Sequence, residues 1–243
     1  VLSVELVRPH LTITLKAREP ELWGDGQNNI AIALQEQGSR LDGSDGTQLL
    51  SAAATAYRAA LEVGTMSKWP VAWAAIQNNL SNTLRAQGGR TNGEAGVTLL
   101  SEAVLACRAA LGVRTEEERP MEWAMTQINL GAALHDLGTR TSGEAGEVML
   151  AEASAVYRAA TRVYTEVDHP ECWAMSKSNL GNTLTAQGER MSVEMGTATF
   201  AEALASHRAA LSVYTEADHP MDWAMTMVNL AWSEAALAEH ERC

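Results

Sequence analysis

Apolar side chains recur along the chain at helical spacing. One face of segment 70–89 carries side chains at i, i+4, i+7 and i+11, namely Trp73, Gln77, Leu80 and Leu84. Segment 150–163 is instead rich in alanine, the strongest helix former, whose small side chain allows close helix packing. The pattern predicts two kinds of helix that alternate along the chain.

These two segments belong to a repeat with a period of 50 residues. Proline, tryptophan and asparagine each recur five times without slippage, and arginine recurs in two further columns of four. The columns are Pro20, Pro70, Pro120, Pro170 and Pro220; Trp23, Trp73, Trp123, Trp173 and Trp223; Asn29, Asn79, Asn129, Asn179 and Asn229; Arg40, Arg90, Arg140 and Arg190; and Arg58, Arg108, Arg158 and Arg208. Five columns with the same period do not arise by chance, so the sequence predicts a repeat architecture.

Each repeat is predicted to be a pair of helices. The first helix begins at the proline, which suits an opening turn because its missing N–H would be unpaired there. We expect it to end in a left-handed turn at a glycine: Gly38, Gly88, Gly138 or Gly188. The second helix is expected to start near Asn92 or Ser142 as N-caps, and residues 165–169 connect one pair to the next.

The period divides the chain into one repeat domain, 1–243. It comprises a half repeat 1–19, full repeats 20–69, 70–119, 120–169 and 170–219, and a half repeat 220–243. Residues 1–15 align with 51–65, so they are interpreted as a second helix, disturbed by Pro9. The helix after Pro220 has no partner in the sequence and is predicted to be poorly capped. Trp69 and Trp232 lie outside the Trp column, and either is a candidate for exposure.

Two motifs resemble those of the tetratricopeptide repeat. They are Asn129-Leu130-Gly131-x-x-Leu134 followed by Gly138, and Ala153-x-x-x-Tyr157-x-x-Ala160. The resemblance implies an all-α fold, a right-handed α-solenoid of stacked antiparallel helix pairs. The unit of 50 residues exceeds the usual one of about 34 residues, and Gln77 or Gln127 occupies the usual Trp position, so the layout is closer to the longer repeats of the kinesin light chain type.

The same resemblance suggests where a partner binds. In such proteins the first helices line a concave groove, and the asparagine of the Asn-Leu-Gly signature bonds the backbone of an extended peptide. An amide both donates and accepts, and methionine adds adaptable apolar contact. The candidate peptide-binding residues are Asn29, Asn79, Asn82, Asn129, Asn179, Asn182, Asn229, Met125, Met175 and Met225. The alternative is that each asparagine bonds a neighbouring helix or loop.

Charge and cysteine content narrow the class of partner. The net charge of -12 disfavours nucleic acid and favours a neutral or basic peptide. Three cysteines without a CxxC motif indicate free thiols in a reducing compartment, and the sequence contains neither a membrane-spanning stretch nor an export signal. We therefore expect a cytoplasmic protein that does not bind membranes. The chain does not begin with Met and is interpreted as a processed form or a fragment.

The remaining repeated residues are interpreted as structural. We expect the Trp column to pack neighbouring repeats together, and the two Arg columns to cap helix ends or link repeats. Glu166, Asp168 and His169 recur as Glu216, Asp218 and His219, which indicates helix-start chemistry, although a metal site near Cys172 is an alternative. Because no nucleophile, phosphate-loop or metalloprotease motif occurs, we predict no enzyme activity, no metal and no cofactor.

The repeat and the family resemblance lead to two hypotheses for the function. The first is a protein-interaction scaffold that binds an extended segment in the groove of the first helices. The alternative is a self-assembling module, a homo-oligomer formed through its unpaired terminal helices.

Overall fold

The computed structural model describes residues 16–242, and every regular element in that range is a helix. The helices are α2 (Pro20–Arg40), α3 (Gly43–Val63), α4 (Pro70–Gly89), α5 (Gly93–Leu111), α6 (Pro120–Arg140), α7 (Gly143–Val163), α8 (Pro170–Gly188), α9 (Val193–Leu211) and α10 (Pro220–His240). The all-α prediction is confirmed. The predicted half repeat 1–19 falls almost wholly outside the described residues.

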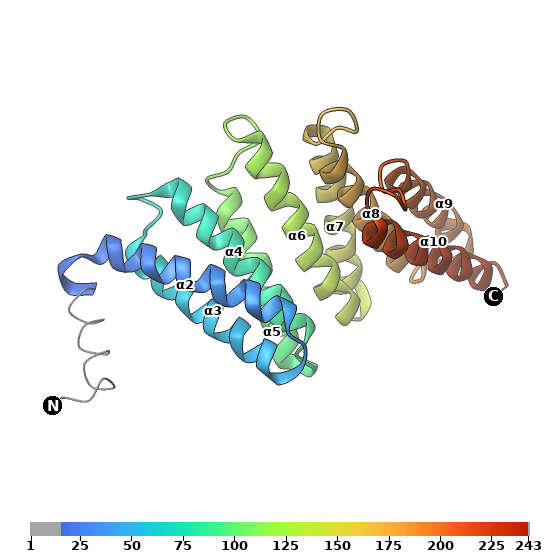
Figure 1. Cartoon of the computed structure of the whole chain (residues 1–243). Coiled ribbons are helices and arrows are strands. Elements are labelled where there is room, and N and C mark those ends of the chain that lie inside the picture. Colours follow the sequence, from blue (N-terminus) through green and yellow to red (C-terminus); the bar gives the residue numbers. More distant parts are fainter. Residues whose placement is uncertain (1–15, 243) are drawn as a thin grey trace. The chain divides into compact units, whose positions relative to one another are not determined.

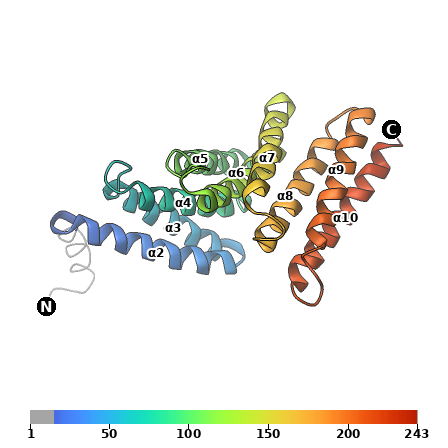
Figure 2. The same ribbon diagram turned by 90° about the horizontal axis from the view of Figure 1, so that it is seen from above.

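Consecutive helices pack as antiparallel pairs, and within each of two units the pairs stack on their neighbours (Figures 1 and 2). The pairs are α2 with α3, α4 with α5, α6 with α7, and α8 with α9, while α10 packs on α8 and α9. Contacts divide the chain into two compact units, one ending at Arg114 and the other beginning at Thr115. Each unit is a stack of helix pairs, as expected of a solenoid; the right-handed superhelix stays a prediction.

The proline column begins the first helices, as predicted. Each of α2, α4, α6, α8 and α10 has its proline in the first turn, where the missing N–H costs no helical hydrogen bond. Asn92 and Ser142 occupy the expected N-cap positions of α5 and α7, but neither side chain makes a capping hydrogen bond. The chain enters these helices instead through Gly93 and Gly143, whose φ angles of 67° and 68° are left-handed.

The physical reason expected for the helix-ending glycines is wrong. Gly38, Gly88, Gly138 and Gly188 are buried and do not adopt left-handed φ angles. They allow close packing on the second helix of the same repeat, because a Cβ at Gly88 would lie 3.0 Å from Leu100 and one at Gly188 would lie 2.8 Å from Phe200.

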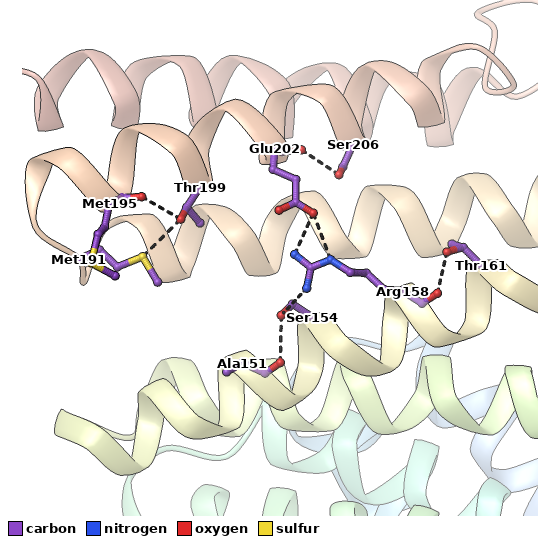
Figure 3. Close-up of polar contacts among 9 residues, drawn as sticks. All are labelled: Ala151, Ser154, Arg158, Thr161, Met191, Met195, Thr199, Glu202 and Ser206. Atoms are coloured by element: carbon purple, nitrogen blue, oxygen red, sulfur yellow. Dashed lines mark hydrogen bonds and ion pairs between the residues drawn. The ribbon is translucent and has the colours of Figure 1, made fainter.

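Where the structure shows their partners, arginines of both columns have the structural roles predicted for them, except Arg40, which pairs with Glu36 of its own helix. Arg90 donates to the carbonyls of Gly38 and Leu41 at 2.8 and 2.9 Å, and Arg190 makes the corresponding contacts two pairs later, in the second unit. These bonds satisfy carbonyls at the end of the preceding first helix. In the other column Arg158 of α7 pairs with Glu202 of α9 at 2.8 Å, a link between neighbouring second helices (Figure 3).

The duplicated acid and histidine residues belong to the connecting loops. The Thr165 hydroxyl accepts from the Asp168 N–H at 3.0 Å and donates to its carboxylate at 2.7 Å, and Thr215 and Asp218 repeat this turn. His169 packs edge-on against Tyr164. Within residues 16–242 no three His, Cys, Asp or Glu side chains are placed to share a metal ion. No helix in the same range is long and apolar enough to cross a bilayer.

Candidate binding groove of the first helices

An open groove of about 350 Å³ lies on the first-helix surface of the second unit. It is formed by α6, α8 and α10, and its lining residues are His135, Thr139, Asn182, Thr185, Ala186, Glu189, Asn229, Trp232 and Ser233. Two of the predicted peptide-binding residues, Asn182 and Asn229, therefore meet in one groove.

Hydrogen bonds between neighbouring first helices form the floor of the groove. The His135 imidazole contacts the Thr183 hydroxyl at 3.1 Å, and the hydroxyls of Thr185 and Ser233 lie 2.7 Å apart. Thr183 and Ser233 are buried, so these bonds satisfy polar atoms that water cannot reach. The three helices are thereby held at a fixed spacing.

The groove presents both polar and apolar groups to solvent. Asn182 and Asn229 are partly exposed, and each amide can donate and accept at once. Trp232, which lies outside the tryptophan column, is 68% exposed, as expected of a candidate for exposure. Within the column Trp23 is buried, and Trp73, Trp123, Trp173 and Trp223 are half-buried. Glu189 adds an exposed carboxylate at the rim. Such a surface can bond a peptide backbone, bury an apolar side chain and attract a basic one.

The other predicted asparagines are also at the surface or half-buried. Asn29 is exposed, while Asn79, Asn82, Asn129 and Asn179 are intermediate. Asn79 hydrogen-bonds the Tyr57 phenol, and that phenol donates to Gln35 at 2.8 Å. Burial raises the pKa of Tyr57 to about 12, and the bond from Asn79 offsets this only in part. Asn79 therefore bonds a neighbouring helix, which is the alternative that the sequence left open.

The three predicted methionines have different surroundings. Met175 packs against a buried cluster of Ala174, Ala210 and Tyr214. Met125 is half-buried, and Met225 is 62% exposed. Apolar contact in the groove itself comes from Trp232 and Ala186.

Sequence reasoning did not select several groove residues: His135, Thr185, Glu189 and Ser233. His135 and Thr185 stand at the same repeat position as Gln35, which bonds Thr83 at 2.9 Å in the first unit. These three residues share the role, but the residue type at this position runs glutamine, arginine, histidine, threonine over the four repeats, so no column is visible in the sequence.

Comparison with known proteins adds no family. No family model matches the chain, and no curated protein is significantly similar to it. The structure itself shows a repeated array of helix pairs, which is the architecture of a helical repeat protein.

Proposed function

We propose that the chain is a tetratricopeptide-type scaffold that binds an extended protein segment along its first helices. The observation that carries the proposal is the groove in which Asn182, Asn229 and Trp232 face solvent together. The two amides bond the backbone of the segment, and the indole covers one of its apolar side chains. The protein then acts by binding and without a cofactor.

Charge selects the segment. A net charge of -12 and Glu189 at the groove rim favour a neutral or basic segment by raising its encounter rate. The proposed setting is the cytoplasm, which suits the free thiols of Cys107 and Cys172.

The test uses a displayed library of random peptides selected on the wild-type chain. We expect the selected peptides to be neutral or basic. Their affinity should fall by about tenfold or more in the double variant Asn182→Ala and Asn229→Ala, because two backbone hydrogen bonds are lost. Isothermal titration of one selected peptide against both proteins measures the change.

Gln48→Ala is the matched control, since it removes an exposed amide from the second helix α3. It should leave the affinity unchanged. Selected peptides that bind the double variant as tightly as the wild type would show that the groove is not the binding site.

One observation favours self-assembly as a second function. The face of α10 that a second helix covers in other repeats is open in the described residues. Ala224 is exposed, whereas Ala124 and Ala174 at the same repeat position are fully buried. Val228 is 68% exposed, whereas Ile128 is buried. A second copy of the chain would cover this apolar face.

If so, light scattering should show the molar mass rising with concentration. Val228→Glu should abolish the rise, because it places a carboxylate on the buried face of the contact. Val167→Glu is the control, since Val167 is 89% exposed in a loop. A monomer at the highest accessible concentration would remove this second function.

A further inference from the structure

A pocket of about 300 Å³ opens in the first unit, at the ends of helices away from any asparagine column. It is bounded by the first two turns of α2 and α4 and by the last turn of α3. Two indoles, Trp69 and Trp73, and two carboxylates, Glu21 and Asp25, contribute to its wall. The volume suits a small ligand or a single side chain.

The two full repeats of the second unit fill the corresponding space with tyrosine, whereas the second repeat has Arg114 at this position. Gly64 lines the pocket, and Tyr164 and Tyr214 stand at the same repeat position. Both tyrosines are buried and donate to a backbone carbonyl of the neighbouring first helix, Tyr164 to Met121 at 2.8 Å and Tyr214 to Glu171 at 3.1 Å. The first repeat lacks this ring, and the pocket remains open.

The glycine is not required by the backbone. Gly64 has φ -78° and ψ 85°, close to the φ -83° and ψ 104° of Tyr164. A Cβ at Gly64 would lie 3.4 Å from the nearest heavy atom, the Ala60 carbonyl oxygen, which is ordinary contact. Gly64 therefore matters because it has no side chain and leaves the pocket open, and not because glycine can adopt unusual backbone angles.

At two further positions the pocket wall carries an aromatic and an acidic residue where the second unit has other residue types. Trp69 stands where the second unit has Arg119, His169 and His219, and Asp25 stands where Met175 packs into a core cluster. Val63 and Ile76 complete an apolar side. Indole rings beside carboxylates attract a cation that carries apolar substituents.

The chain's own lysine shows that this wall holds an ammonium group. The Lys68 Nζ lies 4.2 Å from the ring centroid of Trp69 and 2.6 Å from the Glu21 carboxylate. Lys68 thereby balances the charge of Glu21. Asp25 has no hydrogen-bond or ion-pair partner among residues 16–242, so within that range one carboxylate of the pocket is not paired with a cation.

We propose that this pocket binds an alkylammonium group, held by the Asp25 carboxylate and by the indole of Trp73, since Lys68 already lies over the Trp69 ring. Its alkyl substituents pack against Val63 and Ile76. The group is either a free amine or the methylated lysine of a partner protein. The site lies in the other unit from the peptide groove and does not depend on that proposal.

Choline and its neutral isostere 3,3-dimethylbutan-1-ol are the first probes, titrated by calorimetry and by protein NMR. Choline should bind saturably and at least about tenfold more tightly than the isostere, since only the charged probe gains from the carboxylate and the rings. A trimethyl-lysine peptide distinguishes the two sources. Binding of choline alone indicates a free amine, and binding of both indicates a partner's side chain.

Two variants test the assignment. Gly64→Tyr should fill the pocket as Tyr164 and Tyr214 do, retain the helical circular dichroism and thermal midpoint of the wild type, and lose choline binding. Asp25→Asn should weaken choline binding by about tenfold, whereas the control Asp45→Asn, at the opposite end of α3, should not. Absence of saturable choline binding, equal binding of the isostere, or choline binding by folded Gly64→Tyr would overturn the proposal.

Discussion

Gly131→Ser should lower the free energy of unfolding by about 2–3 kcal/mol, although serine is the better helix former. Gly131 of α6 is buried under the ring of Tyr157 from α7, and a Cβ there would lie 2.7 Å from the ring. Tyr157 is 1% exposed, so an added side chain would have to displace a ring in the close-packed interior. Chemical denaturation followed by circular dichroism measures the change.

The cost should depend on the facing residue. In the preceding repeat the same two positions hold Ser81 and Cys107, and the hydroxyl and thiol lie 2.9 Å apart. Combining Gly131→Ser with Tyr157→Cys recreates that pair. Tyr157→Cys alone should cost about 3–5 kcal/mol, because it leaves a cavity. The double variant should be more stable than the sum of the two single changes by about 1–3 kcal/mol.

Gly26→Ser is the matched control. Gly26 also lies inside a first helix, α2, but a Cβ there meets no atom within 4 Å. It should stabilise the protein by about half a kcal/mol, since only helix propensity changes. Strict additivity of Gly131→Ser and Tyr157→Cys would mean that ring contact does not explain the glycine.

How much of this was predictable from the sequence depends on whether an interaction repeats. The prolines that start first helices, and arginines such as Arg90 and Arg190, recur at fixed positions. Their residue types alone therefore identified the helix starts and the arginines that bond the preceding repeat. The helix-ending glycines were also visible in the sequence, but the physical reason for glycine at these positions was not. Gly188 is required by Phe200, a residue of another helix, and the sequence does not show which side chain lies opposite.

The candidate sites were less predictable, because both depend on departures from the repeat. Asn182 and Asn229 were visible as amides, whereas Thr185 and Ser233 bond each other across two helices and share no motif. The ammonium pocket depends on what Gly64 lacks compared with Tyr214. The change from tyrosine to glycine indicates a pocket only because the structure shows that tyrosine fills the corresponding space in the other unit.

The pairing of ring and glycine recurs in α8 and α9 with a titratable ring. His207 of α9 is fully buried against Gly181 of α8, where a Cβ would lie 2.5 Å from the imidazole. Neither ring nitrogen has a hydrogen-bond partner in the described structure. Burial lowers the pKa of His207 from 6.5 to about 4, because the charged imidazolium cannot be solvated there.

Acid should therefore destabilise the protein through His207. The unfolded chain binds the proton at pH values below 6.5, whereas the folded chain binds it only below about 4. Stability is then complete above pH 6.5 and falls as the pH drops through this window, by about 3 kcal/mol at most. Urea denaturation at a series of pH values from 7 to 4 measures this slope.

His207→Tyr removes the titrating group and reproduces the pair formed by Tyr157 and Gly131. Its unfolding free energy should change less between pH 6.5 and 4 than that of the wild type, with the difference approaching the same 3 kcal/mol. His169→Gln, which removes a half-buried loop histidine, should retain the wild-type slope. Carboxylates titrate in all three proteins, so the difference between variants isolates His207. Parallel pH profiles for wild type and His207→Tyr would show that the imidazole is solvated or paired when it is protonated.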